Sequence, residues 1–208
     1  MAARHPKELT PEQKKKALAY LMLQGGVAAT PAGNHLFLIN DKDPVMLDKK
    51  RCHSFMYIVM QLLYLSQRAR LDIQMAVSFL CGHLSLLDID DYKKAHWVIK
   101  YLRGMLDMPL RLSRDGHGVI QWWIDASFVV HPNMRGHTGG TMSLGKGSTY
   151  STSTKQKLVA QSSTESEVIR VHDILPQTIW TNNFLKEQGM EVKETLVYQD
   201  NMSLMLLE

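Results

Sequence analysis

Three acidic positions in the sequence have the residue type and the surroundings for metal chemistry. Asp125 stands inside the otherwise apolar stretch "WWIDASF", where an uncompensated carboxylate is costly. Asp200 ends the stretch "LVYQD", and ligand sites in α/β sheets gather at the carboxyl ends of strands. A third carboxylate could come from "SSTESE", which holds Glu165 and Glu167. Taken singly, Asp125 could instead face solvent at a strand edge, and Asp200 could cap a following helix.

What these acids can do together depends on which strands are neighbours. If the strands that carry Asp125 and Asp200 lie side by side, both carboxylates converge at the sheet surface, and a Glu from a nearby helix start completes a cluster. Oxygen ligands of this kind suit hard divalent cations such as Mg²⁺. Two such ions activate a water and stabilise the leaving oxygen in phosphodiester hydrolysis. The pattern therefore favours a metal-dependent chemistry on phosphodiesters.

The elements that must position the acids are expected after residue 109. The stretch "PLRLSRDGHGVIQWWIDASFVV" predicts a strand, a turn and a longer strand, and "HTGGTMSLGKGSTYSTST" predicts two short strands. A long helix is predicted from "SSTESEVIRVHDILPQTIWTNNFLKEQG", kinked by Pro176 and ended by Gly189. A fourth strand, "KETLVYQD", and the start of another helix, "NMSLMLLE", follow. We expect an α/β fold with a mixed sheet of three antiparallel strands, a crossover helix and a parallel strand, with "LRL" as an extra edge.

The sequence before this sheet has a helical pattern. Three stretches carry apolar residues at three- and four-residue spacing: "FMYIVMQLLYLSQR", "DIQMAVSFLCGHLS" and "DIDDYKKAHWVIKYLRGML". Asp72 and Asp88 are expected to cap the second and third helices, and Gly104 lies near the end of the third. A short helix is expected from Thr10. The α/β sheet is therefore expected to follow an α-helical segment.

Composition and charge narrow the class of protein. The chain is 45% hydrophobic and 21% charged, an ordinary globular balance. The longest apolar run, "FMYIVMQLLYL", is too short to span a bilayer. The N-terminal stretch lacks an apolar secretion signal, so we expect an intracellular protein that is neither secreted nor in a membrane. Cys52 and Cys81 lack zinc-ligand spacing, and "GTMSLGK" lacks the Ser or Thr that a P-loop requires next.

The charge is distributed unevenly along the chain. Residues 1–115 carry 17 Lys and Arg against 11 Asp and Glu, whereas residues 116–208 carry 7 against 9. A basic N-terminal half of the chain followed by a C-terminal half rich in carboxylates is typical of a polyanion-binding region next to a metal site. The third predicted helix supplies four candidate phosphate contacts: Lys93, Lys94, Lys100 and Arg103.

Five blocks of the sequence stand out together: "LLYLSQRARLDIQMAVSFL", "WVIKYLRG", "WWIDASF", "KGSTYSTSTKQKLVAQSSTESE" and "VYQDNMS". In their residues and their order these blocks resemble the Pol polyprotein of copia-type LTR retrotransposons. The resemblance implies a poorly matched helix and loop over residues 1–50 and the helical end of a reverse transcriptase region over 51–108. An RNase H-like domain is implied over 109–208.

The RNase H family uses an Asp on the first strand, a Glu on the first helix, an Asp ending the fourth strand and a fourth Asp nearer the C-terminus. By resemblance, "WIDAS" and "YQDNMS" place the first and third on Asp125 and Asp200, and the second Glu of "STESE", Glu167, matches the helix ligand. Residues two apart on a helix point about 200° apart, so only one of the two Glu can face the strands. Ser162 and Glu165 have capping-box spacing, in which Glu165 folds back onto the Ser162 amide. The fourth Asp and the polymerase's YxDD-type motif are absent from the 208 residues.

The resemblance implies an activity and its partners. Asp125, Glu167 and Asp200 would hold two Mg²⁺ or Mn²⁺ ions and cleave the RNA strand of RNA·DNA hybrids. The partners would be the hybrid, or another nucleic acid, and the rest of a Pol polyprotein. The alternative is a non-catalytic, degenerate retroelement remnant with at most nonspecific nucleic-acid binding. The two hypotheses differ in whether the three acids bind metal and cleave a hybrid.

Overall fold

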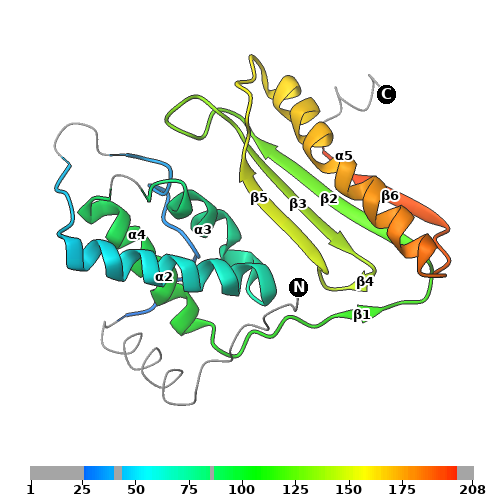
Figure 1. Cartoon of the computed structure of the whole chain (residues 1–208), viewed down its shortest axis with the longest axis horizontal. Coiled ribbons are helices and arrows are strands. Elements are labelled where there is room, and N and C mark those ends of the chain that lie inside the picture. The colour runs from blue at the N-terminus through cyan, green and yellow to red at the C-terminus, as the bar shows by residue number, and fades with distance from the viewer. Residues whose placement is uncertain (1–25, 40–43, 85–86, 201–208) are drawn as a thin grey trace, which may run out of the picture.

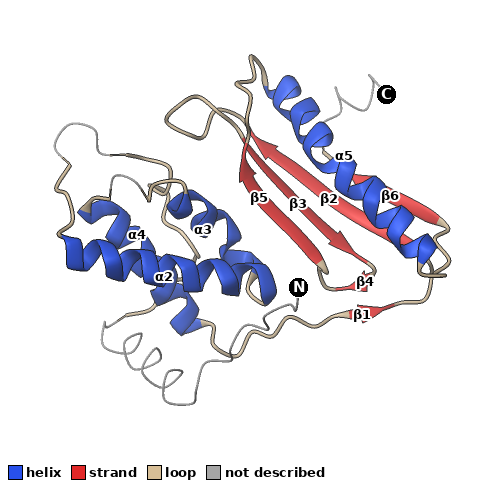
Figure 2. Ribbon diagram, in the orientation of Figure 1, coloured by secondary structure: helices blue, strands red, loops and turns tan. Residues whose placement is uncertain are grey.

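The computed structural model of the chain describes residues 26–39, 44–84 and 87–200. A unit of helices comes first in the chain, and a layer of strands with one long helix follows it (Figure 1). Figure 2 shows the same division by secondary structure. Within the described ranges, none of the helices combines the length and the apolar character that crossing a membrane requires. The helices predicted from Thr10 and over residues 201–208 lie outside the described residues.

The helical unit consists of α2 (Lys49–Arg68), the short 3-10 helix η1 (Leu71–Ile73), α3 (Gln74–Cys81) and α4 (Ile89–Gly104). The apolar faces of these helices share one core, because the three- and four-residue spacing turns them toward one another. Asp88 caps α4 as predicted. Its carboxylate accepts the amide of Asp91 at 2.8 Å, and the Asp91 side chain completes the capping box.

Asp72 does not cap a helix, contrary to the prediction. It lies inside η1, and its carboxylate accepts hydrogen bonds from Arg70 Nε at 3.0 Å, Arg70 Nη2 at 2.8 Å and the Tyr101 hydroxyl at 2.7 Å. Burial by itself would raise the pKa of Asp72, but the bonds from Arg70 and Tyr101 outweigh it and lower the pKa. The carboxylate thus ties η1 to α4, a role that depends on Tyr101, 29 residues away in the sequence.

The main sheet has four strands in the order β5-β3-β2-β6. β2 (Val119–Ser127) pairs antiparallel with β3 (His137–Ser143), which pairs antiparallel with β5 (Tyr150–Lys155). The chain then crosses through α5 (Ser163–Glu187) to β6 (Glu194–Tyr198), which lies parallel to β2. The fold is therefore a mixed α/β one with the predicted strand order, and the first and fourth of these strands are neighbours.

The edge strand predicted at "LRL" is not found there, and the short strand that the structure has nearby pairs with a different partner from the one expected. β1 (Ser113–Arg114) pairs antiparallel with β4 (Gly145–Lys146) in a separate two-stranded sheet and does not extend the main sheet. The turn after β4 requires glycine at position 147, where φ is +77° and a Cβ would lie 2.2 Å from the Arg111 carbonyl oxygen.

The helix α5 covers one face of the main sheet. Side chains alternate along β2, so Ile120, Trp122 and Ile124 are buried in the core that includes α5, whereas Trp123 and Asp125 on the other face are exposed. Figure 1 shows α5 running along β2 and β6. One face of β2 therefore packs in the core, and the other face exposes the Asp125 carboxylate to solvent.

The helix α3 and the strand β5 join the helical unit to the sheet. Gln74, at the start of α3, donates to the Ser151 carbonyl at 3.0 Å and accepts from the Ser151 hydroxyl at 2.6 Å. Gln74 is buried, so these bonds satisfy an amide that has lost its water.

Two buried imidazoles also lie in this contact and form a histidine pair. His131 Nε2 lies 3.0 Å from His137 Nδ1, and His137 Nε2 lies 2.7 Å from the Ser153 hydroxyl. The rings of Phe37 and Phe79, from the helical unit, have their centroids 5.0 Å and 6.1 Å from that of His131. Burial lowers the pKa of each histidine to about 4. The pair is therefore neutral near pH 7.

Candidate metal centre

The three acids singled out in the sequence meet at one place on the sheet. Asp125 lies on β2, Glu167 near the start of α5, and Asp200 just after β6. One carboxylate oxygen from each residue lies within 4.8 Å of the other two. Parallel pairing of β2 with β6 causes this convergence, because strands that run the same way end at the same edge. Asp125 and Asp200 are exposed, and Glu167 is buried.

The start of α5 determines which Glu faces the strands. Ser162 is the N-cap, and its hydroxyl accepts the amide of Glu165 at 3.1 Å. Glu165 folds back, as predicted for a capping role, but its carboxylate accepts the amide of Gln161 at 2.6 Å and not that of Ser162. The carboxylate of Glu165 is thus held at the helix start, and Glu167 is the residue that lies with Asp125.

A buried cation that was not predicted from the sequence, Arg170, lies beside the acids. Arg170 follows Glu167 by three residues on α5 and is 0% exposed. Its Nη2 atom lies 2.6 Å from Glu167 Oε2, and its Nη1 atom lies 3.7 Å from Asp125 Oδ1. Nη1 also donates to the Ile124 carbonyl at 2.7 Å. The sequence did show an acid and a base at i,i+3 spacing on one helix, which predicts an ion pair. That spacing does not show whether the pair is buried.

The pKa of Glu167 is raised, chiefly because burial disfavours its charged form. Arg170 acts in the opposite direction, and the charges of Asp125 and Asp200 add to the increase. Although Glu167 Oε2 is buried, it accepts no hydrogen bond within the described ranges, so its contact with Arg170 is an ion pair without a well-directed hydrogen bond. Glu167 thus keeps one carboxylate oxygen outside this ion pair, and inside a cluster of carboxylates that oxygen could bind a hard divalent cation.

An open groove leads to Asp125 between the helical unit and the uncovered face of the sheet. Its volume is about 340 Å³. The helical side of the groove is formed by η1 and the start of α3, and the sheet side by β2, β3 and β5. The groove gives a solvent-side approach to Asp125 and has these residues among its lining: Asp72, Gln74, Met75, Trp123, Asp125 and Ser153.

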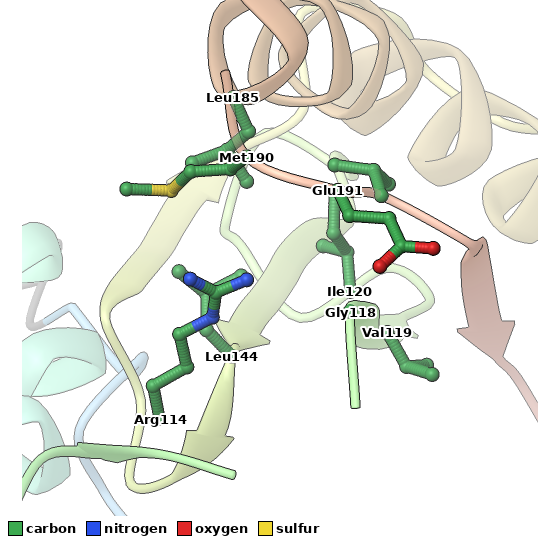
Figure 3. A pocket seen from close by; sticks show the side chains of 9 residues that line it. Arg114, Gly118, Val119, Ile120, Leu144, Leu185, Met190 and Glu191 are labelled. Atoms are coloured by element: carbon green, nitrogen blue, oxygen red, sulfur yellow. The ribbon is translucent and has the colours of Figure 1, made fainter. Parts of the chain in front are cut away.

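A second, much smaller cavity lies toward the other end of β2 (Figure 3). Its volume of about 20 Å³ suits one water molecule. Ile120, Leu185 and Met190 are among its lining residues, together with Arg114 and Glu191. None of the three clustered acids lines it, so this cavity plays no part in the site.

The four basic residues of α4 occupy different environments. Lys93 is exposed, and Lys100 and Arg103 are half-buried. Lys94 is 4% exposed, and its ammonium pairs with Asp90 at 2.8 Å and donates to a backbone carbonyl. Because that charge is already neutralised within the protein, Lys94 is removed from the candidate phosphate contacts. α4 packs on α2 and α3, whereas α3 packs on β5, so these basic residues lie apart from the acid cluster.

Comparison with known proteins agrees with the motifs. Over 179 residues the chain is 28% identical to the retrovirus-related Pol polyprotein from transposon TNT 1-94 of Nicotiana tabacum. The chain is similar to a retrotransposon Pol polyprotein. The match covers 84% of this chain but only 13% of that relative's length. The resemblance stated from the sequence blocks is thereby confirmed. No family model matches the chain. No solved structure matches it.

Proposed function

We propose that residues 109–208 form an RNase H-like domain that uses divalent metal at Asp125, Glu167 and Asp200 to hydrolyse the RNA strand of RNA·DNA hybrids. The observation that carries the proposal is the convergence of one oxygen from each acid within 4.8 Å. The order of three antiparallel strands, a crossover helix and a parallel strand supports the same fold. The similarity to a Pol polyprotein supports the class of substrate.

The chain's own residues would hold and position the metal. Glu167 is fixed by the capped start of α5, and Asp125 is fixed by the register of β2 with β3 and β6. Bound at these carboxylates, Mg²⁺ or Mn²⁺ would supply an activated water and stabilise the leaving oxygen. The exposure of Asp125 and Asp200 leaves room for a phosphate backbone to approach from solvent. Lys93, Lys100 and Arg103 would add contacts to the backbone without reading its sequence.

Asp125→Asn tests the proposal, because it removes a ligand charge and keeps the side-chain size. We expect Mg²⁺-dependent cleavage of a labelled RNA·DNA hybrid to disappear and Mg²⁺ binding to weaken, while the melting temperature stays close to that of the wild type. Asp107→Asn, at an exposed position outside the cluster, is the matched control and should cleave like the wild type. Unchanged hybrid cleavage by Asp125→Asn would refute the assignment.

A retroelement remnant that binds nucleic acid without cleaving it is the second candidate. One observation favours it: the ion pair between Arg170 and Glu167 takes up a carboxylate oxygen that a metal could otherwise use. The same assay separates the candidates. A folded wild-type chain that binds the hybrid in a salt-dependent way, but neither binds Mg²⁺ nor cleaves, supports the remnant.

A further inference from the structure

We propose that Arg170 serves as a built-in cation of the acid cluster, so that the site binds one divalent ion and not two. This inference rests on the proposed function, because it concerns metal at the same three carboxylates. It assigns a role to a residue that the metal chemistry itself does not require.

The guanidinium of Arg170 is held firmly beside the acids. It is 0% exposed, donates to the Ile124 carbonyl at 2.7 Å and donates to Gln199 Oε1 at 3.3 Å. The residues before and after it on α5, Ile169 and Val171, are apolar and at least partly buried. To leave the cluster, the guanidinium would have to abandon a backbone carbonyl and a desolvated carboxylate partner. Separating a buried ion pair in this way is strongly unfavourable. Arg170 therefore remains when a metal arrives.

The charges then favour a single ion. The three ionised carboxylates bring three negative charges, and Arg170 compensates one of them. One divalent cation neutralises the remainder, whereas a second would leave two uncompensated positive charges in a partly buried place. Without Arg170, two divalent ions beside the three carboxylates would leave only one uncompensated positive charge. The guanidinium thus removes most of the electrostatic attraction for a second ion.

The ligand atoms lead to the same conclusion. Glu167 Oε2 is in contact with Arg170, so Glu167 has one oxygen left to offer a metal. Small divalent cations require several oxygen ligands each, and one side chain can hold two ions only if both of its oxygens are available or one is shared. The cluster therefore has enough protein oxygen atoms to anchor one ion well, and the contact with Arg170 leaves fewer of them for a second.

Counting bound ions on the whole 208-residue chain tests the proposal, with Mn²⁺ as the probe. Electron paramagnetic resonance during a Mn²⁺ titration reports how many ions bind and whether two of them are spin-coupled. We expect one ion and no spin-coupled signal for the wild type, and the same for Arg170→Lys, which keeps the charge. Arg170→Met keeps much of the volume and removes the charge. We expect it to bind two ions, the first on the order of tenfold more tightly than the wild type does. Circular dichroism establishes which variants fold.

Each outcome bears on the proposal in a defined way. Two spin-coupled ions in the wild type would overturn the role of Arg170 and leave the proposed metal site standing. A folded Arg170→Met that binds the same number of ions with the same affinity would do so as well. If Arg170→Met does not fold, the ion count of the wild type and of Arg170→Lys decides alone. No Mn²⁺ bound by either the wild type or a folded Arg170→Met would remove the metal site itself, and the proposed function with it.

Discussion

Lowering the pH from about 7.5 to about 5 should weaken the fold through His131 and His137, which join the helical unit to the sheet. Burial lowers the pKa of both to about 4 from an ordinary value of 6.5, and for His131 the neighbouring His137, Lys155 and His83 contribute as well. In the unfolded chain each imidazole takes up a proton as the pH falls through 6.5. In the folded chain neither does so until the pH approaches 4. The unfolded state therefore binds more protons between these values, and the free energy of unfolding falls as the pH falls.

The size of the effect follows from the same two pKa values. Relative to pH 7.5, each histidine reduces the free energy of unfolding at pH 5 by about 2 kcal/mol. The two rings share a hydrogen bond of 3.0 Å, so their protonation is coupled and the joint loss is about 2 to 4 kcal/mol. A loss of this size is a large fraction of the stability of an ordinary domain.

Urea denaturation at the two pH values measures this loss. His137→Gln keeps a hydrogen-bonding side chain that does not titrate, and His117→Gln, at an exposed position, is the matched control. We expect the loss between pH 7.5 and pH 5 to shrink by about half in His137→Gln and to be unchanged in His117→Gln. The raised pKa of Glu167 acts with the opposite sign, but it is common to all three proteins and does not affect their comparison. Equal losses in the wild type and in His137→Gln would show that the pair does not carry the pH dependence.

Two further predictions concern residues whose neighbours in the sequence serve as controls. Lys94→Ala should lower the free energy of unfolding by about 1–3 kcal/mol, because it leaves a part-buried backbone carbonyl and the Asp90 carboxylate without their partner. Lys93→Ala should leave stability unchanged and instead weaken salt-dependent binding of an RNA·DNA hybrid; the reverse pattern would contradict the assignment of the two lysines. Trp122→Ala should cost about 3–5 kcal/mol in urea denaturation, since the side chain is fully buried. Trp123→Ala, at an exposed position on the other face, should cost much less, and similar losses would contradict the alternation along β2.

The sequence predicted the parts of the fold that local pattern controls. The strand that holds "WWIDASF" and the Ser162 cap of α5 are properties of short stretches, and both are found in the structure. The strand order was predictable because a helix between strands favours a parallel crossover. The positions of Asp125 and Asp200 then followed from the ends of the strands that carry them.

The parts that the sequence did not predict depend on tertiary partners. Asp72 stands where a helix cap was predicted, but its carboxylate accepts hydrogen bonds from the neighbouring Arg70 and from Tyr101 on α4, and the bond from Tyr101 is a tertiary contact. The pairing of β1 with β4 depends on a turn that brings two short stretches together. Arg170 is the most consequential omission, since on a helix drawn in isolation it would be assigned to solvent. Its burial arises from the neighbouring strand, where the Ile124 carbonyl accepts its hydrogen bond.

The parallel pairing of β2 with β6 has a consequence for the order in which the molecule can assemble. β2, β3 and β5 follow one another closely along the chain, whereas β6 joins β2 only after the whole of α5 has intervened. Pairings between distant segments carry a larger loop-closure cost than local hairpins. Asp200 is therefore brought to Asp125 by the most non-local pairing in the sheet, and its repulsion from Asp125 and Glu167 opposes that step. A cation bound to the cluster would stabilise the docked position of β6 through Asp200. The strand that we expect to pair last is therefore also the strand that metal would stabilise.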